Sequence, residues 1–138
     1  MSYAPDGTLL FSTTGPETGS DLWLLDPKGT TRALVATSAE EASGRFSPDG
    51  RLLAYSSNTS GRVEVYVQSR ANPADRVQVS ATGGYAPVWS PKSERLYFRR
   101  GTAMMEANIN TTGKLSAGTP VEVFNRGWTL RWTFDVSR

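Results

Sequence analysis

The sequence contains no cysteine and no histidine among its 138 residues. Without cysteine there is no disulfide bond to stabilise a fold. Without either residue type, the sequence has no Ser-His-Asp or Cys-His catalytic arrangement and no zinc site of the usual kind. It also has no Gly-x-Ser-x-Gly nucleophile motif. We therefore expect no metal, no cofactor and no enzymatic activity.

Long apolar runs are also missing. No segment approaches the roughly 20 apolar residues that a transmembrane helix needs. The first five residues have neither the basic start nor the apolar middle of a signal peptide. The sequence as written predicts no membrane span and, with no export signal, a cytoplasmic location.

Net charge is small, at +2, but it is unevenly distributed. Residues 1–69 carry 5 basic and 8 acidic side chains, whereas residues 70–138 carry 10 and 5, and twelve of the fifteen basic residues are arginine. A net charge this close to zero does not favour a polyanionic partner. We interpret the arginines as scattered surface residues and expect no nucleic-acid binding.

What the sequence does contain is a hairpin pattern, clearest in the stretch Arg-Phe-Ser-Pro-Asp-Gly-Arg-Leu-Leu-Ala-Tyr-Ser at residues 45–56. Pro48 presets φ for the first corner of a turn, Asp49 can accept a hydrogen bond from its own backbone, and Gly50 tolerates positive φ. An aromatic residue precedes this turn and an aliphatic run follows it. The pattern predicts a β-hairpin.

The hairpin recurs with a fixed period. Its prolines, Pro5, Pro48 and Pro91, are 43 residues apart, although Lys92-Ser93 replaces Asp-Gly in the third copy. Two further columns keep this spacing, an aromatic one of Tyr3, Phe46, Trp89 and Trp132 and an aliphatic one of Leu10, Leu53 and Leu96. A period of about 40–45 residues with several short strands per unit is typical of β-propeller blades. We expect the four aromatic residues to be buried between blades, and Asp6 and Asp49 to serve the turns.

Most strands can be placed from the pattern, with four per blade named A (inner) to D (outer). In the first blade no strand A is expected, because residues 2–4 are too few, and residues 110–118 are expected to form a polar connection in the third. The expected strands are 8–13, 21–25 and 31–36 in the first blade, 43–47, 51–57, 62–68 and 76–80 in the second, and 85–90, 95–99, 103–109 and 120–124 in the third, followed by a further strand A at 128–136. The single domain, residues 1–138, then divides into blades at about 3–42, 43–83 and 84–127, with 128–138 left as an inner strand.

These repeats resemble those of the TolB propeller family. The likeness is carried by Phe-Ser-Pro-Asp-Gly-Arg-Leu-Leu-Ala-Tyr at 46–55, Ser-Gly-Arg-Val-Glu-Val-Tyr-Val at 60–67 and Gly-Gly-Tyr-Ala-Pro-Val-Trp-Ser-Pro at 83–91. Similar repeats occur in prolyl oligopeptidase-type propellers and in propellers fused to bacterial kinases or regulators. The resemblance implies an all-β propeller, six blades, and envelope or periplasmic partners. It is specific for the repeat and carries no function by itself.

Three blades are too few for a closed ring, because propellers have about four to eight. The missing inner strand at the start and the extra one at residues 128–136 suggest that two chains form one six-bladed ring. In that homodimer each chain would donate residues 128–136 to the first blade of the other, which removes an exposed strand edge. A longer native partner and a truncated chain are the alternatives.

The candidate binding surface follows from the blade pattern. The B-to-C and D-to-A connections of a propeller lie on one face, at the mouth of the axial channel, and aromatic residues with arginine are typical of interaction hot spots. Tyr85 and Trp128 are equivalent by the 43-residue period, and Glu40-Glu41 is the one adjacent acidic pair. The candidate ligand-binding residues on this face are Glu40, Glu41, Arg62, Tyr85, Arg99, Arg100, Arg126 and Trp128.

Three functions fit these observations. The leading one is a noncatalytic propeller module that binds a protein, a peptide or a small ligand at the channel-mouth face. A carboxylate- or metal-dependent propeller hydrolase or lyase using Glu40 and Glu41 is the second. The third is an orphan gene fragment that self-assembles without an evolved partner.

Overall fold

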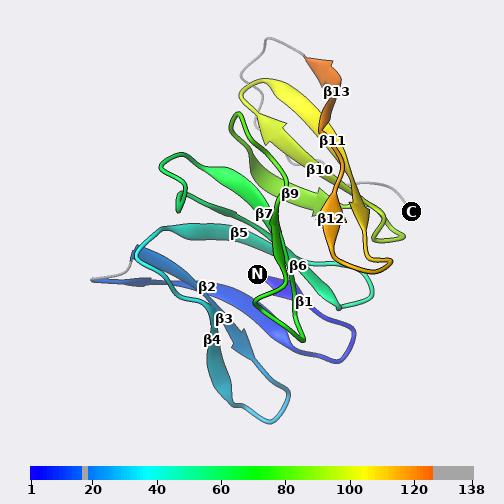
Figure 1. The fold of residues 1–138 in the computed structure, drawn as a ribbon. Helices are drawn as coiled ribbons and strands as arrows, with labels where there is room; N and C mark the ends of the chain where they lie inside the picture. Colours follow the sequence, from blue (N-terminus) through cyan, green and yellow to red (C-terminus); the bar gives the residue numbers. More distant parts are fainter. Residues whose placement is uncertain (17–18, 126–138) are drawn as a thin grey trace.

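The computed structural model describes residues 1–16 and 19–125. Its strands form three antiparallel sheets that follow one another along the chain and fan outwards (Figure 1). The first sheet comprises β1 (Ser2–Tyr3), β2 (Leu9–Gly15), β3 (Gly19–Leu25) and β4 (Thr31–Val35). The second comprises β5 (Glu41–Phe46), β6 (Leu52–Ser57), β7 (Glu64–Ser69) and β8 (Arg76–Gln78). The third comprises β9 (Tyr85–Trp89), β10 (Arg95–Arg100), β11 (Ala103–Asn110), β12 (Ser116–Ala117) and β13 (Val121–Asn125).

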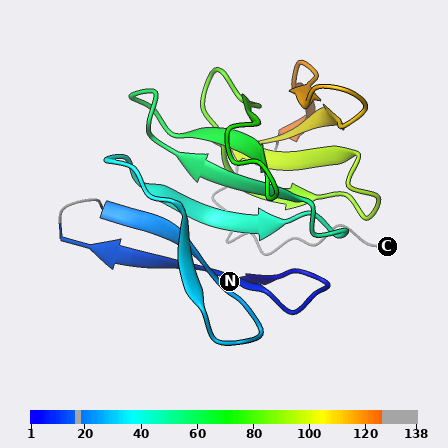
Figure 2. The same ribbon diagram turned by 60° about the horizontal axis from the view of Figure 1, so that its bottom comes forward.

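This arrangement confirms an all-β fold with three blade-like sheets. The described residues include no helix at all, and so none long and apolar enough to cross a membrane. In each sheet the strands lie in chain order from the inner strand outwards. Figure 2 shows the sheets lying one above another, with the first sheet lowest.

The first sheet does have an inner strand, contrary to the prediction. β1 pairs with β2 through Ser2 with Leu10 and Tyr3 with Leu9. It was missed because two residues are too few to show periodicity. β5 pairs with β6 as far as Glu41 opposite Ser57, whereas β1 reaches only two residues of β2.

The outermost strand of the third sheet is interrupted. β12 pairs with Ile109 and Asn110 of β11, and β13 pairs with residues 103–106 of the same strand. Between them the Gly118 N–H still bonds to the Asn108 carbonyl, at 2.8 Å. Pro120, which has no N–H to donate, lies in the interruption. The polar connection predicted for residues 110–118 therefore includes part of this strand.

The hairpin turns have the predicted chemistry. The Asp6 carboxylate accepts a hydrogen bond from the Thr8 N–H at 3.0 Å, and Asp49 accepts one from the Arg51 N–H at 3.1 Å. Gly7 and Gly50 have φ of 86° and 75°. In the third copy Ser93 takes the same left-handed conformation, with φ of 60°.

The aliphatic column is not structurally equivalent in the first sheet. Phe46 faces Leu53 and Trp89 faces Leu96, but Tyr3 faces Leu9 rather than Leu10. The first turn closes one residue earlier, since the Ala4 N–H bonds to the Thr8 carbonyl, whereas the equivalent Ser47 N–H bonds to Leu52. Leu10 therefore keeps the 43-residue spacing in the sequence, but Leu9 is the residue that pairs with Tyr3 in the structure.

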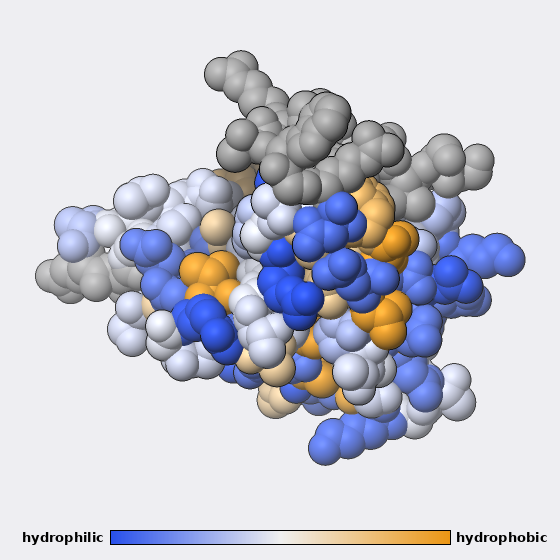
Figure 3. Space-filling view, turned by 90° about the horizontal axis from the view of Figure 1, so that it is seen from above, coloured by the Kyte–Doolittle hydropathy of each residue, from blue (hydrophilic) through white to orange (hydrophobic). Residues whose placement is uncertain are grey.

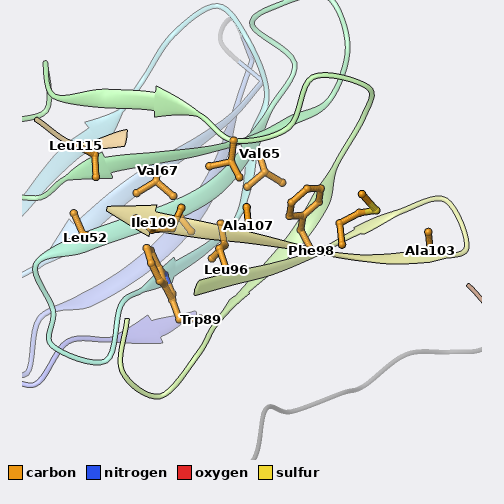
Figure 4. Packing of buried hydrophobic residues seen from close by; sticks show 13 residues of the cluster. Leu52, Val65, Val67, Trp89, Leu96, Phe98, Ala103, Ala107, Ile109 and Leu115 are labelled. Atoms are coloured by element: carbon orange, nitrogen blue, oxygen red, sulfur yellow. The ribbon is translucent and has the colours of Figure 1, made fainter. Parts of the chain in front are cut away.

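Two apolar clusters hold the sheets together. One lies between the first and second sheets and includes Leu10, Leu22, Phe46, Tyr55 and Tyr66, all buried. The other lies between the second and third sheets, where side chains from β6 and β7 meet those from β9, β10 and β11 (Figure 4). Its members include Leu52, Val65, Val67, Trp89, Leu96, Phe98 and Ile109.

The aromatic column is buried only in part. Phe46 and Trp89 are 6 % exposed, as predicted, but Tyr3 is 68 % exposed. The predicted burial of Tyr3 is wrong because the first sheet has no sheet in front of it among the described residues. Trp132 lies outside them.

Close packing also joins the inner strands. A Cβ on Gly44 would lie 2.7 Å from Leu10 Cδ2 and 3.1 Å from Leu22 Cδ2, so β5 approaches the first sheet where only glycine fits. Hydrogen bonds continue the contact, from the Phe46 N–H to Ser2 Oγ at 3.1 Å and from Trp89 Nε1 to the Arg45 carbonyl at 3.1 Å.

The surface is mixed in polarity. On the face seen from above, hydrophobic residues form small separate patches among hydrophilic ones (Figure 3). Single exposed apolar residues are ordinary on a soluble surface, so this face does not define a binding site by hydropathy alone.

Candidate functional site

The predicted channel-mouth face is assembled from loops of neighbouring sheets. The Asn58 N–H and side chain bond to the backbone of Glu40, at 3.3 and 2.8 Å, which ties the B-to-C connection of the second sheet to the connection that leads into that sheet. At the second junction between sheets the Arg62 guanidinium donates to the Ala81 carbonyl at 2.6 Å, and Arg100 donates to Thr82 Oγ1 at 3.1 Å. The B-to-C and D-to-A connections therefore meet at the same end of the sheets.

A buried carboxylate anchors the second junction. Glu64 is 1 % exposed, and its oxygens accept hydrogen bonds from the Gly83 N–H at 3.0 Å, from Arg62 Nε at 2.9 Å and from Ser80 Oγ. These bonds satisfy a charge that would be costly to bury alone. Sequence reasoning missed Glu64, although the 43-residue period aligns it with the buried Asp21.

Of the candidate residues, Arg99 and Tyr85 lie in direct contact. The Arg99 guanidinium lies 5.1 Å from the centre of the Tyr85 ring, and the Tyr85 hydroxyl donates to the Gly101 carbonyl at 3.3 Å. Tyr85 remains 37 % exposed. A cation over an aromatic ring is a favourable contact, so the pair forms a fixed, partly exposed surface.

A cavity of about 260 Å³ opens on the inner strands next to this pair. Arg45 and Arg99 are its two charged side chains, and Ser43 and Ala86 lie on its wall. Both have left-handed backbone, with φ of 56° and 53°, although neither is glycine. They are equivalent by the 43-residue period, and strained backbone of this kind clusters at binding sites.

Glu41 does not lie on the predicted surface. Its side chain is fully buried, where Thr37 Oγ1 donates to Oε1 at 2.6 Å and Ser57 Oγ donates at 3.3 Å. Burial raises the pKa of Glu41, and the nearby Asp21 carboxylate adds to the effect, while the two hydroxyl hydrogen bonds oppose it. Glu40 is exposed instead, since neighbouring residues at a strand end point to opposite sides.

The remaining predicted residues are divided. Arg62 and Arg100 lie on either side of residues 81–84, and Arg100 also approaches Glu122, with 3.7 Å between Nη2 and Oε2. Arg126 and Trp128 lie outside the described residues. No group of three acidic side chains close enough to hold a metal ion occurs within residues 1–16 and 19–125.

Comparison with known proteins gives a likeness of structure. No protein-family model and no curated sequence matches the chain. Putative TolB from Agrobacterium tumefaciens is similar with a TM-score of 0.69 at 18 % identity, over 90 % of this chain and 48 % of that one. TolB from Acinetobacter baumannii is similar with a TM-score of 0.67 at 18 % identity, over 90 % of this chain and 31 % of that one. A structure from a study of two prolyl endopeptidases is similar with a TM-score of 0.55 at 13 % identity, over 88 % of this chain and 21 % of that one.

The fold is that of a TolB-like β-propeller. The chain spans about half or less of the length of these solved structures. At such low identity the TolB-like fold is shared, and the functions of these proteins do not follow from it.

Proposed function

We propose that this protein is a noncatalytic propeller module that binds an acidic protein or peptide through the surface formed by Arg62, Tyr85, Arg99 and Arg100. The observation that carries the proposal is the Arg99 guanidinium held over the exposed Tyr85 ring at 5.1 Å. Arg62 and Arg100 are both fastened to the loop beside it. Aromatic and arginine side chains that are already fixed lose little entropy when a partner binds.

Charge supports an acidic partner. The Arg99 guanidinium lies over the Tyr85 ring, and those of Arg62 and Arg100 are bonded to Ala81 and Thr82 in the loop before it. Arginine binds carboxylates with two parallel hydrogen bonds. Glu64 bonds to Arg62 from inside the fold, so that arginine is oriented while 60 % of its side chain stays exposed. The neighbouring cavity adds Arg45 as a further positive group.

Binding of a hexaglutamate peptide tests the proposal. The double variant Tyr85→Ala/Arg99→Ala should weaken binding about tenfold or more, because both members of the stacked pair are lost. The matched control is Arg32→Ala/Arg51→Ala, two exposed arginines at the opposite end of the sheets, one at the start of β4 and one just before β6, which should bind as the unchanged protein does. Equal affinity in the two double variants, or no binding of hexaglutamate by the unchanged protein, would contradict the proposal.

We also propose that two copies complete a six-bladed ring as a homodimer with strand exchange. The inner edge of β2 supports this, because β1 pairs only with Leu9 and Leu10 and leaves residues 11–15 without a strand on that side among the described residues. Unpaired strand edges favour the addition of a strand. Residues 128–136, with the alternating apolar residues Trp128, Leu130, Trp132, Phe134 and Val136, are the proposed strand from the second copy.

Molar mass in solution tests the ring. The intact chain should have twice the 15.0 kDa of one copy, and a chain that ends at Gly127 should have the mass of a single truncated copy. A dimer that survives this truncation contradicts strand exchange, and a monomeric intact chain contradicts the ring.

A further inference from the structure

The first sheet carries a set of apolar side chains that no other sheet of the described residues covers. Tyr3 pairs with Leu9 across β1 and β2, and Phe11 pairs with Trp23 across β2 and β3. Side chains paired in this way lie on one face of the sheet. We call Tyr3, Leu9, Phe11, Trp23 and Leu25 the open face of the first sheet.

The other two sheets show what normally covers this face. Phe46, Leu53, Tyr55 and Tyr66 hold the equivalent pairs in the second sheet, and they are 0–6 % exposed in the cluster against the first sheet. In the third sheet Trp89, Leu96 and Phe98 are 0–6 % exposed against the second sheet. In this fold the occupant of such a face is therefore the preceding sheet.

On the open face, by contrast, Tyr3 is 68 % exposed, and Leu9, Phe11, Trp23 and Leu25 are only half-buried. Phe11 and Trp23 stand where Tyr55 and Tyr66 stack at 5.8 Å between ring centres. Aromatic side chains of this size bury roughly 150–250 Å² each. A contiguous face of this kind marks an interaction surface.

The third sheet offers the matching surface. Leu96 and Phe98 point into the cluster with the second sheet, so Arg95, Tyr97 and Arg99 lie on the opposite side. Glu106 is paired with Tyr97 and lies 3.9 Å from Arg95, measured from Oε2 to Nη1. We call Arg95, Tyr97 and Glu106 the outer face of the third sheet, and leave out Arg99, which is held against Tyr85 at the end of the strand.

Arginine on aromatic rings already occurs at the junction between the first two sheets. The Arg70 guanidinium lies 5.3 Å from the Phe46 ring centre while it bonds to Asp6 of the first sheet at 2.8 Å, and Arg76 lies 4.8 Å from the Tyr66 ring centre. The outer face, with Arg95 and Tyr97, is chemically suited to an aromatic face in the same way.

We propose that the open face of the first sheet is covered by the outer face of the third sheet of a second copy of this chain. The inference rests on the proposed two-copy ring and names its contact surfaces. Each ring then contains this contact twice, once at each junction between copies, as two-fold symmetry requires. The outer face is more polar than the face of the second sheet that carries Leu52, Val65 and Val67. The association is therefore reversible rather than permanent.

Complementation between two variants tests the pairing of faces. Trp23→Glu alters the open face and Tyr97→Glu alters the outer face, so each variant alone should weaken dimerisation about 30-fold or more, by placing a charge in both contacts. An equimolar mixture should recover two-copy particles, because a mixed pair keeps one unaltered contact. Val63→Glu, an exposed loop residue 45 % accessible, is the matched control and should dimerise as the unchanged chain does.

The outcomes separate this inference from the proposed ring. A monomeric unchanged chain overturns both. A dimeric unchanged chain that stays dimeric in Trp23→Glu, or variants whose mixture stays monomeric, overturns the pairing of faces alone. Tyr3→Glu provides a second variant on the open face, since a side chain 68 % exposed can change without unfolding the sheet, and it should also weaken dimerisation.

Discussion

At the scale of single residues, the two adjacent acids Glu40 and Glu41 differ more than the sequence predicts. Both were expected on the surface, but strand geometry turns one outwards and buries the other beside Thr37 and Ser57. The Oε2 atom of Glu41 has no hydrogen-bond partner among the described residues. A carboxylate in this position is costly when ionised.

The pH dependence of stability follows from this burial. The folded-state pKa of Glu41 is raised above its ordinary value of 4.5, so its folded form favours the proton and its contribution to stability falls as pH rises from about 4.5. Glu41→Gln removes this loss. The free energy of unfolding of the variant minus that of the unchanged chain should therefore be larger at pH 7 than at pH 4.5. Urea titrations at both pH values measure it, with Glu40→Gln as the exposed control. A constant difference between the two pH values would contradict the expectation.

Gly44 gives a second prediction at this scale. Gly44→Ala places a methyl group 2.7 Å from Leu10 Cδ2, inside the buried cluster between the first two sheets. Overpacking of this kind costs about 1–3 kcal/mol. Gly118→Ala is the control, because its nearest neighbour would be the Asn108 Cβ at 3.6 Å. Thermal unfolding should show a lower Tm for Gly44→Ala only, and equal Tm values would show that the sheets can separate to make room.

At the scale of the strand and turn, the repeated hairpins set most of the fold, and their deviations were the hardest to foresee. The sequence predicts the first two hairpins because proline, aspartate and glycine have fixed roles in turns, and it predicts the third from the 43-residue period. It does not reveal that the first turn closes one residue early, which makes Leu9 and not Leu10 the partner of Tyr3. That choice and the burial of Glu41 depend on contacts between the first two sheets, whereas the exposure of Tyr3 reflects the lack of a preceding sheet among the described residues.

The degenerate third turn can be tested by exchanging residues. Ser93 has φ of 60°, a left-handed conformation that costs a non-glycine residue about 1–2 kcal/mol. Ser93→Gly should therefore stabilise the protein, by up to about 1 kcal/mol after the entropy lost by glycine is counted. Gly50→Ser should destabilise it, since a Cβ there would also meet Pro5 Cδ at 2.8 Å. Chemical denaturation of both variants should give changes of opposite sign; a loss of stability in Ser93→Gly would refute the turn argument.

At the scale of the whole molecule, the second sheet is the structural centre. It is covered on one face by the first sheet and on the other by the third, through the two clusters that hold the fold together. The first sheet is covered on one face only within the described residues. Local stability should follow this difference, because amides open more readily where fewer apolar contacts hold them.

Hydrogen exchange measures this gradient and relates it to assembly. In the Trp23→Glu variant, amides of β2 and β3 that bond between strands should exchange about tenfold or more faster than the equivalent amides of β6 and β7. The proposed docking of a second copy on the open face of the unchanged chain predicts that the ratio shrinks as protein concentration rises. Amides of β6 and β7 serve as the internal control, since they are already buried on both sides. A ratio that does not depend on concentration would mean that nothing docks on the open face, and a ratio of one in Trp23→Glu would mean that the first sheet does not need a cover.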